Sequence, residues 1–151
     1  MAFPGWKRHA PQPTLDRLGE LLGNVRSAGL TVSAHTTGEP AHLTPGIELS
    51  AFRIIQEALS NATWYAPGAE VRVEAGHRPS AGTFRIADTA PTRTAQPSPG
   101  VGHGLLGMWE RAAVLRGTLA LGATSDGGYE VIAMLPTQLP AIPADLVEGN
   151  P

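Results

Sequence analysis

The chain has 151 residues, a formal net charge of −2, a charged fraction of 16% and no cysteine. This length suits one domain with a real core, and the balanced charge argues against a nucleic-acid partner. The lack of cysteine excludes disulfides and thiolate metal sites, and no apolar run approaches the ~20 residues of a membrane helix. We therefore expect a soluble cytoplasmic domain, connected to a membrane only through a longer parent protein.

Both ends of the chain are rich in proline and lack any hydrophobic period. Residues 1–13 also carry basic side chains, which indicates a linker or an expression remnant. Residues 139–151 follow Pro136 and indicate a flexible tail. The predicted domain therefore spans residues 14–138.

The first predicted elements are a helix and a strand. Thr14 can cap a helix over residues 15–28, which Gly29 can end. Its apolar stripe consists of Leu15, Leu18, Leu22 and Val25. Residues 30–36 then alternate as a half-buried strand does, with Leu30, Val32 and Ala34 on one face. Residues 42–44 are a candidate for a short partner strand.

Residues 48–66, ELSAFRIIQEALSNATWYA, show the three-and-four apolar spacing of a helix packed on a core. Glu57 and Asn61 lie four residues apart, so their side chains sit one turn above the other at the border of the buried stripe. A carboxylate and a carboxamide in this arrangement can hold a hard cation such as Mg²⁺, or activate a water. The pair also fits ordinary boundary residues of an amphipathic helix.

The second half of the chain alternates strands with one long irregular segment. Strands are predicted over residues 69–75 and 83–87, the second ending on Asp88. Residues 89–104 form a long Pro/Gly-rich loop, and such loops are usually functional or disordered. A helix over 105–115 and strands over 118–121 and 129–135 follow, with a hairpin turn at 125–128.

This order of elements predicts an α/β (α+β) fold. Hairpin-length connections between strand pairs favour a mixed, mostly antiparallel sheet with helices on one face, a two-layer sandwich. The pattern does not favour a doubly wound parallel sheet.

A glycine motif precedes the last predicted helix. Gly102, Gly104 and Gly107 match G-x-G-x-x-G, and Asp126 lies at the distance expected of a ribose-binding acid. The context argues against a dinucleotide site, because a loop precedes the glycines and Asp126 belongs to a hairpin turn. Glycines before a helix do let backbone N–H groups approach a phosphate. A flexible connector is the other interpretation.

Three features now occur in one order: the helix with Glu57 and Asn61, the strand that ends on Asp88, and the loop GVGHGLLGM. Together they resemble the ATP-binding domain shared by sensor histidine kinases, gyrase and MutL, the GHKL ATPases with the Bergerat fold. More narrowly, RIIQEALSNA, Asp88 and the segment from GHGLLGM to Pro136 resemble the catalytic domain of NarL-partnered histidine kinases. The resemblance covers residues 14–136.

The resemblance implies ATP and Mg²⁺ as ligands and a role for each motif. It implies that Glu57 positions or activates water near the phosphates, that Asn61 supplies an oxygen to Mg²⁺, and that Asp88 accepts a hydrogen bond from the adenine amino group. The residues that would contact phosphate are Gly100, Gly102, His103 and Gly104. Those that would line the adenine side are Leu105 and Met108.

Two departures from the family pattern bear on nucleotide affinity. Trp64 stands where family members often place a lysine or arginine that faces the phosphates. The segment after Asp88 contains Ala90 and Pro91 in place of the family's glycines, which stiffens the start of the loop. Arg93 or Arg111 is a candidate replacement for the lost charge.

The resemblance implies the catalytic domain of a two-component sensor histidine kinase. Such a domain transfers the γ-phosphoryl group of ATP to a histidine on a dimerisation domain, which this chain lacks, and a response regulator acts downstream. None of the five histidines lies in the helical H-[DE] setting of a phosphoacceptor. Two alternatives stay open: an anti-sigma or partner-switching regulator that phosphorylates a serine, and an interaction module that no longer binds nucleotide.

Overall fold

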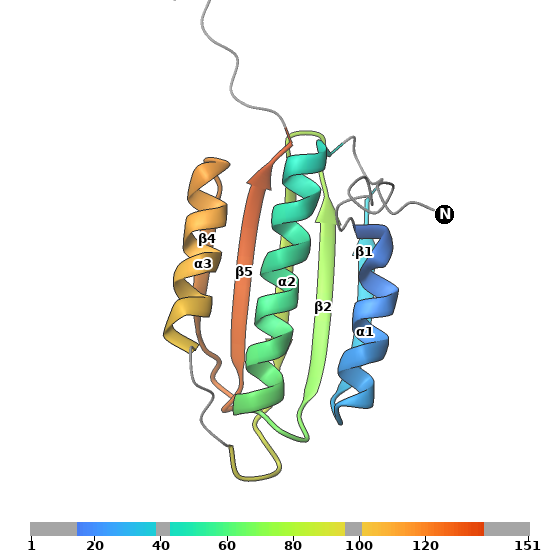
Figure 1. The fold of residues 1–151 in the computed structure, drawn as a ribbon, viewed down its shortest axis with the longest axis vertical. Coiled ribbons are helices and arrows are strands. Elements are labelled where there is room, and N and C mark those ends of the chain that lie inside the picture. Colours follow the sequence, from blue (N-terminus) through green and yellow to red (C-terminus); the bar gives the residue numbers. More distant parts are fainter. Residues whose placement is uncertain (1–14, 39–42, 96–100, 138–151) are drawn as a thin grey trace, which may run out of the picture.

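The computed structural model describes residues 15–38, 43–95 and 101–137. In this part of the chain, helices cover one face of a five-stranded sheet (Figure 1). The elements in order are η2 (Leu15–Arg17), α1 (Leu18–Ser27), β1 (Thr31–Thr37), α2 (Pro45–Tyr65), β2 (Glu70–His77), β3 (Ala81–Asp88), α3 (Val101–Val114), β4 (Thr118–Ala123) and β5 (Tyr129–Pro136).

Several predictions concern parts of the chain outside the described residues. These are the linker at residues 1–13, the tail at 139–151, the cap at Thr14 and the phosphate contact at Gly100. Among the described helices, none is both long enough and apolar enough to span a bilayer.

The sheet confirms the predicted two-layer architecture. Its strand order is β1-β2-β3-β5-β4, with β1 parallel to β2 and every other neighbouring pair antiparallel. Helix α2 connects the two parallel strands and crosses the middle of the sheet, with α1 on one side and α3 on the other (Figure 1). The hairpins β2–β3 and β4–β5 were both expected from the sequence.

Helix α2 begins three residues before the predicted start because its cap is Thr44. The Thr44 hydroxyl accepts a hydrogen bond from the backbone N–H of Ile47 at 3.3 Å, and Pro45 occupies the first turn, where no N–H partner is needed. The prediction of a strand at residues 42–44 is therefore wrong for Leu43 and Thr44, while residue 42 lies outside the described residues. The buried residues of α2 are Ile47, Ala51, Phe52, Ile54, Ile55, Ala58, Leu59 and Ala62.

The amino-terminal unit is confirmed in outline. Gly29 follows α1 with φ of +104°, and Leu30 and Val32 are buried. Ala34 is exposed on β1, which is the edge strand next to β2 in the described sheet. The Arg26 guanidinium donates to the carbonyl of Val32 at 2.8 and 3.2 Å. This contact ties the end of α1 to the edge strand.

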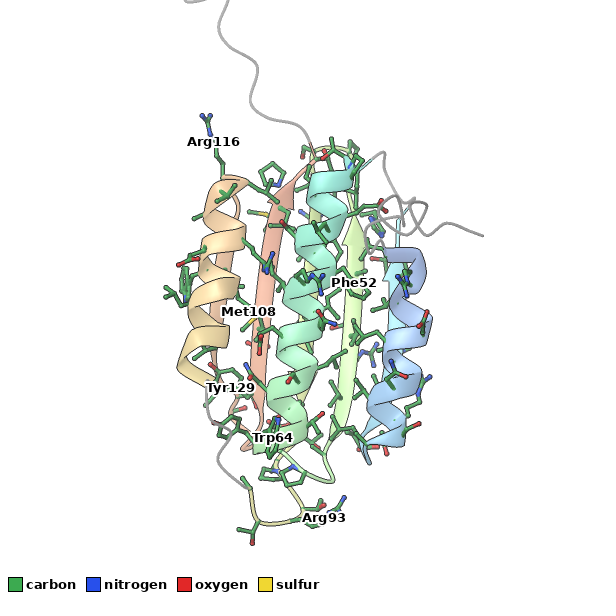
Figure 2. The ribbon with its side chains drawn as sticks, viewed as in Figure 1. Phe52, Trp64, Arg93, Met108, Arg116 and Tyr129 are labelled. Atoms are coloured by element: carbon green, nitrogen blue, oxygen red, sulfur yellow. The ribbon has the colours of Figure 1, made fainter. Side chains whose placement is uncertain are left out.

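Helix α3 begins at Val101, four residues before the predicted start. Gly102 and Gly104 therefore lie inside the first turn of the helix, and the prediction that they belong to the preceding loop is wrong. Glycine disfavours a helix interior by up to about 1 kcal/mol, so the sequence alone points to a loop. Packing of α3 on α2, through the buried Met108 between them, offsets this preference (Figure 2).

Charged residues line the sheet face that the helices leave open. Arg85 on β3 contacts Glu74 on β2 at 2.9 Å and Glu130 on β5 at 2.8 Å. The hydrogen bond from Arg85 lowers the pKa of Glu74 below its ordinary value. Opposite-charge pairs across strands stabilise a sheet modestly and keep its open face hydrated.

We expect the core to depend strongly on Phe84, which is fully buried on β3 and meets the His77 ring edge-on at 6.3 Å. Phe84→Ala should lower the free energy of unfolding by about 3–5 kcal/mol, because it removes apolar contact and leaves a cavity. Met134→Ala is the control, since that side chain is 43% exposed on β5. Urea denaturation should show little change for the control, and an equal loss for both variants would contradict this account of the core.

Candidate functional site

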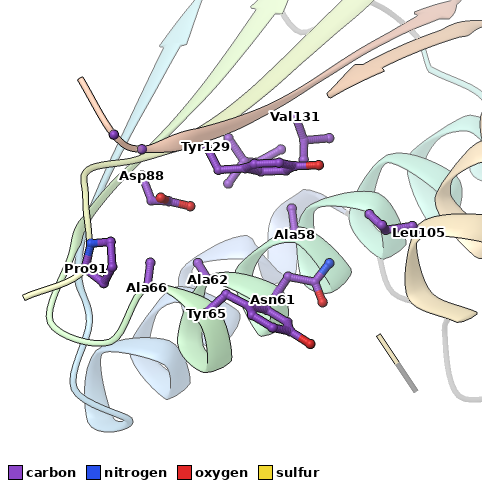
Figure 3. Close-up of a pocket in the computed structure, with 13 residues that line it drawn as sticks. Ala58, Asn61, Ala62, Tyr65, Ala66, Asp88, Pro91, Leu105, Tyr129 and Val131 are labelled. Atoms are coloured by element: carbon purple, nitrogen blue, oxygen red, sulfur yellow. The ribbon is translucent and has the colours of Figure 1, made fainter. Parts of the chain in front are cut away.

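A cavity of about 390 Å³ opens between the second half of α2 and the ends of β3 and β5 (Figure 3). Its helix side is formed by Ala58, Asn61, Ala62 and Tyr65. Its sheet side is formed by Ile86, Asp88, Gly128, Tyr129 and Val131, and its rim includes Pro91 and Leu105. The volume lies within the roughly 300–1,000 Å³ of small-molecule sites, and the lining is mostly apolar with a few polar groups.

The cavity exists because α2 presents small side chains to this part of the sheet. Ala58 and Ala62 lie four residues apart, on one face of the helix, and both are buried. Their methyl groups leave room that leucine or isoleucine would fill. A second row with the same spacing, Glu57, Asn61 and Tyr65, runs beside them, and Asn61 and Tyr65 supply polar groups to the cavity.

Asp88 is the acidic group of the cavity. It ends β3 opposite Tyr129 on β5, whose backbone N–H donates a hydrogen bond to its carboxylate. Burial raises the pKa of Asp88 to about 6, and the negative charge of Asp126 adds to the increase. At neutral pH the carboxylate is therefore ionised in an apolar surrounding, where it strongly favours a ligand that brings a hydrogen-bond donor.

The β4–β5 turn brings the strand end close to Asp88. Gly127 has φ of +88°, and a side chain at Gly128 would collide with the carbonyl oxygen of Asp88. Thr124 and Asp126 are hydrogen-bonded to each other, and the Gly128 N–H donates to Thr124 Oγ1 at 3.1 Å. Asp126 therefore belongs to the turn, as expected, which agrees with the rejection of a dinucleotide fingerprint.

A second hollow, of about 460 Å³, lies beside the cavity between α2 and α3. Glu57 and Gly104 line this hollow, whereas their neighbours Asn61 and Leu105 line the cavity. The two spaces therefore meet along one seam of α2 and α3. A Cβ at residue 104 would lie 2.5 Å from Glu57 Oε2, so a side chain here would require the Glu57 carboxylate to move.

The structure divides the predicted site residues between these two spaces. Asn61, Asp88 and Leu105 surround the cavity. Glu57, Gly104 and Met108 border the hollow, although Met108 is only 1% exposed and mainly packs in the core. Gly102 and His103 lie in the first turn of α3, and their side chains are outside the described part of the structure.

The two departures noted in the sequence differ in position, because Pro91 lies on the cavity rim and Trp64 does not. The Trp64 side chain is 42% exposed and is not among the cavity residues. Arg93 lies near Gly29 and Gly68, beyond the end of α2, whereas Arg111 lines the hollow beside Glu57. Of the two candidate replacement cations, only Arg111 lies next to the predicted site.

Sequence reasoning missed the two tyrosines of the cavity. Figure 3 shows Tyr129 on the sheet side and Tyr65 beside Asn61 on the helix side. The position of Tyr65 could have been predicted from helical spacing, because it continues the row of Glu57 and Asn61. The position of Tyr129 could not, because its place opposite Asp88 depends on the pairing of β3 with β5.

No protein-family model matches this chain. The chain is 27% identical over 130 residues to the signal transduction histidine-protein kinase/phosphatase DegS of Brevibacillus brevis, a match that covers 81% of this chain. The chain spans 26–33% of the length of the curated relatives it matches, and all of these are histidine kinases.

Solved structures match the fold. The catalytic domain of histidine kinase ThkA superposes with a TM-score of 0.56 at 11% identity, covering 80% of this chain and 93% of that one. The fold is that of a histidine kinase catalytic domain. Full-length ShkA in complex with AMPPNP superposes with a TM-score of 0.60 at 19% identity, covering 89% of this chain and 32% of that one.

The contact between Gly104 and Glu57 in this kinase fold can be tested with a matched pair of glycines in α3. Gly107→Ala should raise the free energy of unfolding by about 0.5–1 kcal/mol, because alanine favours helix and nothing lies within 4 Å of the new methyl group. Gly104→Ala should lack this gain, because its methyl group would push against the Glu57 carboxylate. Equal stabilisation in urea denaturation would contradict the close approach.

The raised pKa of Asp88 should make stability depend on pH. Its pKa rises from 3.8 to about 6 on folding, so the folded state binds the proton more tightly and the ionised group destabilises the fold above pH 6. Asp88→Asn should therefore be more stable than wild type at pH 7, by about 1 kcal/mol after allowance for solvent screening.

This advantage of Asp88→Asn should shrink as the pH falls through about 6 towards 4, where the wild-type carboxyl is protonated. Urea denaturation of both proteins across this range measures the difference. A constant difference would show that Asp88 titrates normally in the folded chain.

Proposed function

We propose that this chain is the ATP-binding catalytic domain of a two-component sensor histidine kinase. The observation that carries the proposal is the half-buried Asp88 carboxylate facing an apolar cavity of about 390 Å³, with Asn61 on the opposite wall. An apolar slot with one carboxylate at its end suits a flat base that carries an amino group. Adenine has this chemistry.

In the proposed complex Asp88 accepts a hydrogen bond from the adenine amino group. The base lies between the alanine face of α2 and the Tyr129 side of β5, and Leu105 closes one edge. Ionised Asp88 makes a charge-assisted hydrogen bond, which is about twice as strong as a neutral one. The hydrogen bond from the bound base thus offsets part of the free-energy cost of burying the Asp88 charge.

The residues on the seam suit the phosphates. Among the described residues no cluster of three His, Cys, Asp or Glu can hold a metal ion by itself. Mg²⁺ usually binds through one or two protein oxygens together with substrate phosphates and water, so the oxygen of Asn61 fits as one ligand. When bound, Mg²⁺ would neutralise phosphate charge.

The remaining roles follow from position along the seam. Glu57 lies one turn of α2 before Asn61 and faces α3, where it can orient the group that receives the phosphoryl. Backbone N–H groups at the start of α3 suit phosphate oxygens, because the positive end of a helix attracts anions. We assign phosphate contacts there to Gly100, Gly102 and Gly104, with His103 as a further donor.

The reaction we propose is transfer of the γ-phosphoryl group of ATP to a histidine on a dimerisation domain of the parent protein. A response regulator would then receive the group. The similarity to DegS, a signal transduction kinase/phosphatase, and to ShkA, solved with AMPPNP, supports this proposal. The GHGLLGMWERAAVL segment favours the NarL-partnered type of kinase, and residues 14–138 are the proposed domain.

The first test is calorimetric titration of the chain with a non-hydrolysable ATP analogue, with and without Mg²⁺. Asp88→Asn should weaken binding by about tenfold, because a neutral acceptor replaces an ionised one. Asn61→Ala should reduce the effect of Mg²⁺. Ser60→Ala, an exposed neighbour on α2, is the control and should bind as wild type does. An absence of heat at millimolar nucleotide would refute the proposed function.

A further inference from the structure

Among the described residues, none that lines the cavity proposed for the base carries a positive charge. They are apolar residues, glycines, two tyrosines, Asn61 and Asp88, without lysine or arginine. A nucleoside triphosphate brings several negative charges, and Asp88 adds another. Cationic side chains for the phosphates must therefore come from outside the cavity, in addition to any metal ion.

The hollow beside the cavity contains such side chains. It is lined by Arg53, Gln56, Glu57, Gly104, Gly107, Met108 and Arg111. Figure 1 shows that α2 and α3 run in opposite directions. Moving from Gly104 to Arg111 along α3 is therefore moving in the same direction as from Glu57 back to Arg53 along α2. The two arginines face one space just past the seam.

These arginines are not neutralised within the described part of the chain. Arg53 Nη1 donates to Gln56 Oε1 at 2.8 Å, and neither Arg53 nor Arg111 forms an ion pair with a described residue. Glu57 lies in the same hollow and is likewise without an ion pair there. By contrast, Arg85 on the open sheet face contacts two carboxylates. Two guanidinium groups and one carboxylate leave the described lining of the hollow net positive, which favours an anion.

We propose that this hollow receives the terminal phosphate of the bound nucleotide, with Arg53 and Arg111 as its cationic contacts. The inference rests on the proposed function. With the base at Asp88, the phosphates leave the cavity past Asn61 toward the hollow, and the Glu57 carboxylate, which lies against Gly104, turns aside to admit them. A guanidinium group matches phosphate oxygens with paired N–H donors. Gly104 and Gly107 have no side chains, so they leave space for the phosphates beside α3.

The decisive experiment compares a diphosphate with a triphosphate. Titration calorimetry in Mg²⁺ gives Kd for ADP and for AMPPNP, and the ratio of the two isolates the terminal phosphate. In Arg53→Gln and Arg111→Gln this preference for AMPPNP should fall by about five- to tenfold, while the Kd for ADP changes less than twofold. Arg111→Lys should retain part of the preference, because it keeps the charge but loses the planar pair of donors.

Arg78→Gln is the matched control. It removes the same charge from an exposed position in the β2–β3 turn, distant in sequence from both helices, and should leave the ratio unchanged. Urea denaturation of each variant verifies folding, which exposed or half-buried arginines should not alter.

Three results would overturn the inference. An unchanged ratio in both glutamine variants would show that the arginines do not contact the terminal phosphate and would leave the hollow for another anion, such as an acidic segment of a protein partner. An equal increase in the Kd for ADP and for AMPPNP would show that the arginines contact the inner phosphates or stabilise the fold. Wild-type chain that binds neither nucleotide would refute the proposed function itself, and the inference with it.

Discussion

The packing of α2 across the middle of the sheet is the constraint on which the rest of the structure depends. The helix must bury a wide apolar face to hold two layers together, yet it presents alanines where β3 ends and β5 begins. Full burial along most of the helix supplies the stability that lets one end stay under-packed. The cavity is therefore a consequence of side-chain size on a single helix, and the same helix carries Asn61 to the cavity and Glu57 to the hollow beside it.

The two sides of the seam differ in electrostatics as well as in shape. The cavity is apolar and holds a carboxylate whose raised pKa reflects the free-energy cost of its burial. The hollow is polar and holds Arg53, Arg111 and Glu57 in contact with solvent. This separation suits a ligand with a flat apolar base at one end and a charged chain at the other, because each part meets the surroundings that favour it.

Much of this arrangement was predictable from local pattern. The spacing of apolar residues located α2 and the strands, and the Ser-Asp-Gly-Gly turn located the last hairpin. The errors arose where tertiary contacts override local preference. Glycine and proline near residue 101 indicated a loop, but packing on α2 extends α3 to Val101. Leu43 and Thr44 looked like strand, but the Thr44 hydroxyl caps α2.

The sequence by itself determined the order of the elements and the two-layer class of the fold, because these depend on periodicity and on neighbours along the chain. Its resemblance to a kinase family marked Glu57, Asn61 and Asp88 as predicted site residues. Only the tertiary structure decided which residues share a space. It placed Tyr129 opposite Asp88, and it placed Arg111 in the same hollow as Glu57. Trp64 does not line the cavity. Such contacts depend on strand register and on how closely two helices approach, and neither is written in local sequence pattern.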